Sequence, residues 1–326
     1  MSKKRDMQAA LEGRQPPGAV PIWEIEFHAW DRASGRHVIL GQEFAALSLA
    51  EQEKALYANA EILISVSHDL HYAALTVPGG YWEVSPGTAA YYWLPGEARY
   101  RQIEVLYEVG VGDLMLVAGS GGVMAMPGAT NYVEFAYKLF DAPHEIDAQA
   151  QHTLAHGLEA ARRFRDMGIE ALFTASDIAD NHGPFFNPQQ MERFILPYLA
   201  KWAHGVREMG GYAILHTDGD LSPCLEGIAE SGLHALQAID PIAGMDIRRV
   251  KEEVGTRLCL CGNVDCGLLV KGTPEQVYHE TRALLLDCKP GGGLVLGASN
   301  AVQRAVSIEN YGAMIRAWQE HGAYGP

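Results

Sequence analysis

Short apolar runs alternate along the chain with longer segments that carry apolar residues at helical spacing. Each run has the length of a β-strand, and Gly, Pro, Asp or Asn residues bound it. The eight runs are residues 20–27, 71–78, 111–119, 171–177, 212–219, 234–241, 257–265 and 293–299. Strands that alternate with helices form parallel βαβ units, and eight such units predict an α/β protein with a single closed (β/α)8 TIM barrel.

Three stretches of the chain carry more specific signals of their local structure. Residues 188–210 have one apolar stripe at steps of three and four, and Pro197 inside it is expected to kink this helix. A capping box at 273–276, with proline at the first helical position, predicts that a helix begins at Pro274. The glycine-rich stretch 119–122 lacks the spacing of a phosphate-binding loop, so a turn or tight packing is favoured.

No linker or low-complexity tract divides the chain. Residues 1–19 are predicted to form a tail or a short helix, and residues 20–326 to form the barrel. The stretch 79–98 is too long and too aromatic for a plain connection, because it contains Tyr81, Trp82, Tyr91, Tyr92 and Trp93. We interpret it as an insertion over the barrel mouth or as a subunit contact, which would pair two copies in a homodimer.

Composition narrows the classes of function. The chain has 326 residues and a formal net charge of −15, from 25 basic and 40 acidic side chains. This argues against nucleic acid and anionic membranes as partners, because both need a basic surface. The five cysteines suggest no disulfide framework, and Cys259 and Cys261 on one predicted strand are interpreted as buried apolar residues. No apolar run approaches the roughly 18 residues of a membrane span, and no secretory signal is recognised, so a cytoplasmic location is expected.

Polar residues follow several predicted strands at their C-terminal ends, where (β/α)8 barrels place their active sites. They are Glu24, Glu26, His28, Asp177, His216, Asp218, Asp240, Asn263, Asp265 and Asn300. Buried carboxylates cost several kcal/mol unless they are paired, protonated or coordinated. A ring of them therefore implies a cation, a pair that shares a proton, or a substrate rich in hydrogen-bond donors.

Two interpretations of these residues stay open. His216 and Asp218 could hold a divalent metal with a third ligand from Glu26 or His28, or they could act as a general acid–base pair without metal. For Asp177, His216 and Asp218 a functional role is favoured, since they directly follow very apolar strands. For the acidic residues Asp220, Asp240 and Asp265, capping of the next helix is favoured.

The order and spacing of short motifs over roughly residues 170–320 resemble the uroporphyrinogen decarboxylase superfamily. The matching pieces are Ser176-Asp177, Phe186-Asn187-Pro188, Leu196-Pro197-Tyr198, His216-Thr217-Asp218-Gly219, Gly244-Met245-Asp246-Ile247, Gly262-Asn263-Val264-Asp265, Gly272-Thr273-Pro274 and Glu309-Asn310. The resemblance implies a (β/α)8 barrel. The superfamily also holds zinc-dependent methyltransferases that exchange methyl groups between corrinoid proteins and thiols.

The decarboxylases of this superfamily carry an Arg-containing, Gly-rich segment after the first Trp, which neutralises the carboxylates of the substrate. Here Trp23 is followed by Glu24 and Glu26, and Arg32 and Arg36 come later without that segment. An acidic strand end would repel a polycarboxylate. The Asp that holds the pyrrole N–H groups in the decarboxylases corresponds by motif to Asp177.

The methyltransferases resemble this chain better in the first and fifth strands. Their zinc motif is His-x-Cys plus a Cys in the last strand–helix loop. His216 matches, but Asp218 stands at the first Cys and Asn300 near the second. A metal held by these harder ligands suits an oxygen-bearing substrate, such as a methoxy compound, better than a thiol.

The resemblance and the site residues together predict a methyltransferase-like enzyme that demethylates a small methylated compound, with a corrinoid on a partner protein as the acceptor. The expected catalytic residues are Asp177, His216 and Glu26; the expected ligands of zinc or another divalent metal are His216, Asp218 and Glu26; and the expected substrate contacts are His28, Asp240, Asn263 and Asn300. The alternatives are a decarboxylase (a carboxy-lyase), in which Asp177 stabilises a cationic pyrrole-like intermediate, and a non-catalytic protein that binds a small ligand.

Overall fold

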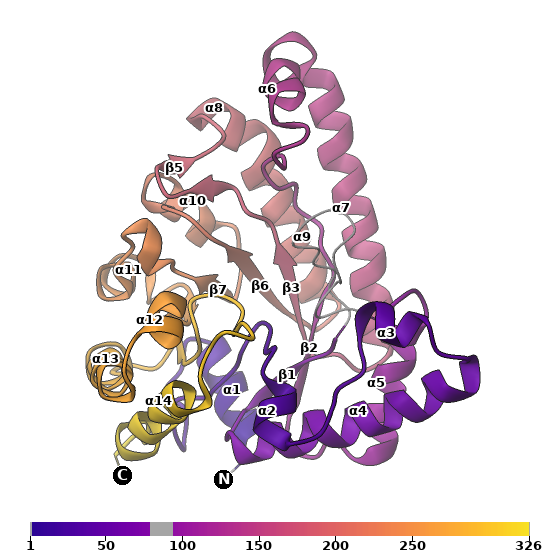
Figure 1. The fold of residues 1–326 in the computed structure, drawn as a ribbon. Helices are drawn as coiled ribbons and strands as arrows, with labels where there is room; N and C mark the ends of the chain where they lie inside the picture. The colour runs from indigo at the N-terminus through magenta and orange to yellow at the C-terminus, as the bar shows by residue number, and fades with distance from the viewer. Residues whose placement is uncertain (1, 79–93, 326) are drawn as a thin grey trace.

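Seven parallel strands curve around a common core in the computed structural model, which describes residues 2–78 and 94–325 (Figure 1). In order around the sheet they are β1 (Ala74–Thr76), β2 (Met115–Gly119), β3 (Ala171–Ala175), β6 (Tyr212–Thr217), β7 (Ala235–Ala238), β8 (Cys259–Cys261) and β9 (Leu294–Val295). Each lies inside one of the predicted runs. A short antiparallel hairpin, β4 (Ala179–Asp180) with β5 (Gly183–Pro184), follows β3 and was not predicted.

The predicted first strand, residues 20–27, joins the two edges of this sheet. Ile22 forms parallel bridges with both Tyr72 and Leu296. The Trp23 N–H donates to the Leu296 carbonyl at 3.0 Å, and the Ala73 N–H donates to the Ile22 carbonyl at 2.8 Å. This segment pairs only through isolated bridges, and Pro21 within it has no N–H to donate. The predicted TIM-barrel fold is confirmed.

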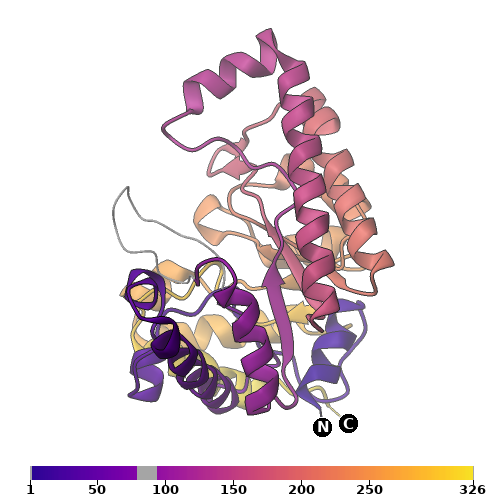
Figure 2. The same cartoon turned by 90° about the vertical axis from the view of Figure 1, so that its right-hand side faces the viewer.

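Helices surround the barrel, and none among the described residues is both long and apolar enough to cross a bilayer. They are α2 (Trp30–Ser34), α3 (Gly41–Ala45), α4 (Leu49–Asp69), α5 (Ala98–Val109), α6 (Tyr132–Asp141), α7 (Pro143–Asp166), α10 (Leu225–Glu230), α11 (Ile247–Val254), α12 (Cys266–Lys271), α13 (Pro274–Cys288) and α14 (Ile308–His321). The capping box of α13 is confirmed, because the Thr273 hydroxyl accepts from the Gln276 N–H at 3.2 Å and Gln276 Oε1 accepts from the Thr273 N–H at 2.9 Å. Figure 2 shows α6 and α7 projecting beyond the barrel on the side away from the two chain ends.

The segment 188–210 is helical but interrupted. It consists of α8 (Pro188–Gln190), a π-helical turn (Met191–Ile195) and α9 (Leu196–Glu208). The Leu196 N–H donates to the Met191 carbonyl, five residues back. Pro197 has no N–H to continue an α-helical ladder, so the irregularity that proline requires is taken up in the turn before it.

The N-terminal helix α1 (Lys3–Leu11) closes one end of the barrel. Its Met7 and Leu11 side chains are almost fully buried and pack with Trp23, Met115 and other residues of the barrel interior. This interior is filled by side chains, as is usual for the fold. Cys259 and Cys261 belong to it, which confirms their interpretation as buried apolar residues, and all five cysteines are free thiols.

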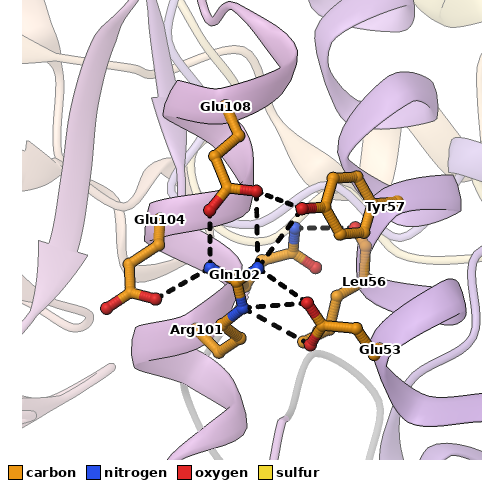
Figure 3. Close-up of polar contacts among 7 residues, drawn as sticks. All are labelled: Glu53, Leu56, Tyr57, Arg101, Gln102, Glu104 and Glu108. Carbon is orange, nitrogen blue, oxygen red and sulfur yellow. Dashed lines mark hydrogen bonds and ion pairs between the residues drawn. The ribbon is translucent and has the colours of Figure 1, made fainter. Parts of the chain in front are cut away.

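The predicted insertion at 79–98 falls mostly on residues 79–93, which lie outside the described residues. The helix that follows it, α5, is tied to α4 by one guanidinium (Figure 3). Arg101 donates to Glu53 on α4 and to Glu104 and Glu108 on α5. Beneath this cluster the buried Gln102 donates from Nε2 to the Leu56 carbonyl at 3.0 Å. Exposed ion pairs contribute little individually. Here three carboxylates share one cation, and its bond to Glu53 joins α5 to α4.

Gly122 in the stretch 119–122 serves tight packing, one of the two roles expected for this stretch. A Cβ on Gly157 of α7 would lie only 2.2 Å from Cα of Gly122. A Cβ on Gly122, whose φ is +126°, would lie 2.2 Å from Cδ1 of Trp202 on α9. The loop after β2 is therefore pressed between α7 and α9, and only glycine fits at these two positions.

Replacing Gly157 with Ala is expected to lower the free energy of unfolding by about 2–3 kcal/mol, because the new methyl group overlaps backbone that cannot move aside. Gly312→Ala on α14 is the matched control, since its Cβ would meet only the Arg316 guanidinium at 3.7 Å. That control should be neutral or stabilising by up to about 1 kcal/mol, from helix propensity. Urea denaturation of both variants measures the difference, and equal stabilities would contradict the proposed close approach.

Candidate active site

Three predicted site residues meet at the C-terminal ends of two neighbouring strands. Ile214 of β6 faces the barrel interior, so strand alternation places His216 and then Asp218 on the same side near the rim. Asp177 follows β3, whose Ala175 pairs with His216. The ligand atoms of Asp177, His216 and Asp218 all lie within 4.8 Å of one another.

The Asp218 carboxylate is held but not satisfied. Its Oδ2 accepts a hydrogen bond from Nδ2 of Asn300, and its backbone N–H donates to Oδ1 of Asp177 at 3.2 Å. Its other oxygen, Oδ1, is buried and has no hydrogen-bond partner. Burial raises the pKa of Asp218 to about 6, and the charges of Asp177 and Asp240 act in the same direction, whereas His216 lowers it. Burial without a second partner makes ionisation of this carboxyl unfavourable, and a nearby cation would favour it.

His216 is 8% exposed, and its Nδ1 makes a hydrogen bond with Oε1 of Gln237. The two residues are register partners on the adjacent strands β6 and β7, which brings their side chains together. Gln237 also donates from Nε2 to the Ala298 carbonyl at 3.4 Å. The sequence analysis missed Gln237. The available signal was a lone amide inside an otherwise apolar buried strand.

Glu26 lies outside the cluster of Asp177, His216 and Asp218, so the structure does not bring this predicted metal ligand to the other two. Asp177 is the third residue there that could hold a metal. Glu26 Oε2 instead lies 2.9 Å from Nε2 of His28, the neighbour that was expected to touch substrate. The two form a partly buried pair of their own. Their roles as catalytic and substrate-binding residues stay predictions.

Glu24, from the same segment, lies on the outer side of the barrel wall. Trp23 and Ile25 occupy the interior, so the residue between them faces α14. There Glu24 accepts hydrogen bonds from the Ala298 N–H at 2.9 Å and from the Tyr311 hydroxyl at 2.8 Å. It is 4% exposed, and burial raises its pKa to about 8 against the opposing effect of these two hydrogen bonds.

The other acidic residues at the rim cap turns, as favoured above. Asp240 accepts from the Ile242 N–H at 2.9 Å, and Asp265 accepts from the Gly267 N–H. Asp220 accepts from both the N–H and the hydroxyl of Ser222. The turn uses one carboxylate oxygen of Asp240. The expected role of Asp240 in substrate binding stays a prediction.

The two asparagines expected to contact substrate already have protein partners. Asn263 donates from Nδ2 to the Ile239 carbonyl at 2.7 Å. Asn300 donates to Asp218, and its Oδ1 accepts from the Ala301 N–H at 2.6 Å. Asn300 therefore positions Asp218, and substrate contact would be an additional task for both residues.

The donor set fits a divalent cation. One imidazole nitrogen and two carboxylates are within reach of a common point, and zinc, iron and manganese accept such mixed nitrogen and oxygen ligands. The orphaned Oδ1 of Asp218 would gain the partner that the protein does not provide. A cation would also relieve the repulsion between Asp177 and Asp218.

Fold and site together define an α/β-barrel protein with a compact acidic cluster at the C-terminal ends of its strands. Residues 123–321, more than half of the chain, match the family model of uroporphyrinogen decarboxylase (URO-D). The chain belongs to this family, and the predicted resemblance is confirmed.

Two kinds of enzyme occur among its relatives. The chain is 30% identical over 177 residues to a methylated-thiol–coenzyme M methyltransferase of Methanosarcina mazei. This alignment covers 54% of this chain and 43% of that protein. The chain is also 30% identical over 190 residues to a uroporphyrinogen decarboxylase of Hydrogenovibrio crunogenus, covering 50% of that protein. The chain thus spans half or less of the length of these two curated relatives. Over 96% of both chains it is 25% identical to a uroporphyrinogen decarboxylase of Cronobacter sakazakii.

Among solved structures, a methyltransferase from Methanosarcina mazei superposes with a TM-score of 0.68 over 98% of this chain and 99% of that one. The sequence identity is 19%, so this likeness concerns the fold. The relatives named here are enzymes, which supports an enzymatic function for this chain and leaves the reaction to be determined.

Proposed function

We propose that the chain is a methyltransferase-like enzyme that removes a methyl group from a small oxygen-bearing compound, such as a methoxy compound, and passes it to a corrinoid on a partner protein. The observation that carries the proposal is the cluster of Asp177, His216 and Asp218, with its buried, unpartnered carboxylate oxygen. The similarity to a curated methyltransferase supports it.

The three residues would hold zinc or another divalent metal. When bound, such a metal stabilises negative charge on the oxygen that loses the methyl group. Asn300 keeps the Asp218 carboxylate in place, and the Asp218 N–H does the same for Asp177. With oxygen ligands where related methyltransferases have thiolates, the site favours an oxygen substrate over a thiol.

Decarboxylation of a polycarboxylate is the alternative, and the full-length similarity to the Cronobacter sakazakii protein speaks for it. The two arginines that follow Trp23 are, however, engaged elsewhere. Arg32 donates to the backbone carbonyls of Arg304 and Val306, and Arg36 pairs with Glu61 at 2.8 Å. Both guanidiniums therefore already have protein partners, and an acidic cluster suits an uncharged methyl donor better than a polyanionic substrate.

Metal analysis tests the proposal directly. The purified protein is expected to contain about one equivalent of a divalent metal by plasma emission, and both His216→Ala and Asp218→Ala should lose it. His182→Ala is the matched control, because this histidine lies on the exposed β4–β5 hairpin. Wild-type protein that neither contains nor takes up a divalent metal, or that releases carbon dioxide from uroporphyrinogen, would overturn the assignment.

A further inference from the structure

Gln237 contacts the candidate metal ligand His216 at its Nδ1 atom, and its two amide atoms have different partners. Nε2 faces the Ala298 carbonyl at 3.4 Å, and Oε1 faces Nδ1 of His216. A backbone carbonyl can only accept a hydrogen bond, so the amide group that faces it must be the donor, –NH2. This fixes which way round the Gln237 amide lies.

The orientation of the amide in turn fixes the proton on the imidazole. An amide oxygen can only accept, so Nδ1 of His216 must carry the hydrogen of the bond between them. A neutral imidazole with hydrogen on Nδ1 bears its lone pair on Nε2. We propose that Gln237 is a positioning residue, which holds His216 in the Nδ1–H tautomer and leaves the Nε2 lone pair free for the ligand or substrate bound between Asp177 and Asp218.

The support for Gln237 extends to the neighbouring strands. The Ala298 carbonyl accepts a hydrogen bond from Gln237, and the Ala298 N–H donates one to the buried Glu24 at 2.9 Å. Two residues later, Asn300 donates to Asp218. One short stretch after β9 therefore positions both His216, through Gln237, and Asp218, through Asn300. Such outer partners orient metal-binding side chains and are worth roughly 10–100-fold in metal affinity.

The tautomer can be tested without any metal, which separates this inference from the proposed function on which its metal-binding part rests. In the metal-free wild-type protein labelled with 15N in its histidine rings, long-range 1H–15N spectra should show His216 as the Nδ1–H form. The signals that disappear in His216→Ala assign the residue. In Gln237→Leu the same ring should shift toward the Nε2–H form, which neutral imidazole prefers in water. An Nε2–H tautomer in the wild type would overturn the inference.

Zinc affinity, measured by competition with a chromogenic chelator, provides the second readout. Gln237→Leu is expected to bind Zn²⁺ about 10–100-fold more weakly than the wild type. Gln237→Glu keeps an oxygen acceptor at Nδ1 and should recover most of the affinity. Gln102→Leu is the matched control, because this equally buried glutamine lies between α4 and α5 and donates to a backbone carbonyl there.

The controls separate positioning from stability. Gln102→Leu should lose stability and keep its zinc affinity. If Gln237→Leu binds Zn²⁺ as tightly as the wild type, or if Gln237→Glu is as weak as Gln237→Leu, the positioning role is refuted. A wild type that binds no Zn²⁺ while His216 is the Nδ1–H tautomer would refute the metal assignment alone.

Discussion

The free energy of unfolding is expected to fall by about 4 kcal/mol through Glu24 alone when the pH rises from about 5 to about 8. Burial raises the pKa of this carboxyl from 4.5 to about 8 in the folded protein. The folded state therefore binds the proton more tightly than the unfolded state. The stabilising contribution is complete below the unfolded pKa, and it is lost at about 1.4 kcal/mol per pH unit until the folded pKa is reached.

Glu24→Gln removes this titration while keeping an amide that can bond to the Ala298 N–H and to Tyr311. Denaturant unfolding at several pH values should show wild type and variant diverging between about pH 5 and pH 8, with the wild type losing more stability. Glu26→Gln is the control, because the Glu26 side chain is 19% exposed and lies beside His28. Parallel pH profiles for wild type and Glu24→Gln would show that the carboxyl is not buried as described.

His216→Ala and Asp218→Ala are expected to reduce methyl transfer at least about a thousandfold, a loss of about 4 kcal/mol of transition-state stabilisation. Under the proposed function, either change removes a ligand of the metal, and loss of the metal leaves the remaining carboxylate of the cluster uncompensated. The assay follows the absorbance of reduced cobalamin with a panel of methoxy compounds as methyl donors. Among these donors, the one that the wild type turns over fastest is used for the variants.

Asp265→Asn is the matched control for this assay. Asp265 follows a neighbouring strand but caps α12, and asparagine caps helices equally well. Its activity should stay within a few fold of the wild type. A loss of less than tenfold in both His216→Ala and Asp218→Ala would contradict their assignment to the reaction centre.

The barrel was predictable from sequence because its parallel strands are buried on both faces. Runs such as 171–177 and 212–219 begin with mostly apolar residues and end in polar ones, which locates both the strand and its functional end. Asp177, His216 and Asp218 were expected to converge for this reason, and the structure places them together. The β4–β5 hairpin has only two residues per strand and gives too short a pattern to recognise.

Other parts of the site depend on packing that a single sequence does not encode visibly. In the segment 20–27, alternate residues point to opposite sides of the barrel wall. Trp23 and Ile25 point into the interior, because burying their large apolar side chains is favourable, and Glu24 therefore points outward. Alternation from Glu24 therefore gave the wrong face. Gln237 acquires its role only through its register with His216, and strand register is a property of the assembled sheet.

Within the described residues, α1 closes the base of the barrel, so the acidic cluster is open to ligands at the opposite end, where the strands end. Met7 and Leu11 of α1 fill the end of the barrel opposite to the acidic cluster, and packed side chains fill the interior between them. Under the proposed function, the methyl donor would enter, and its demethylated product would leave, by the face that the corrinoid protein would also approach. The donor would then have to bind before the corrinoid protein covers this face, and the methyl group would pass directly between the two bound reactants. A kinetic scheme for the proposed reaction would therefore include an obligatory order of binding and release.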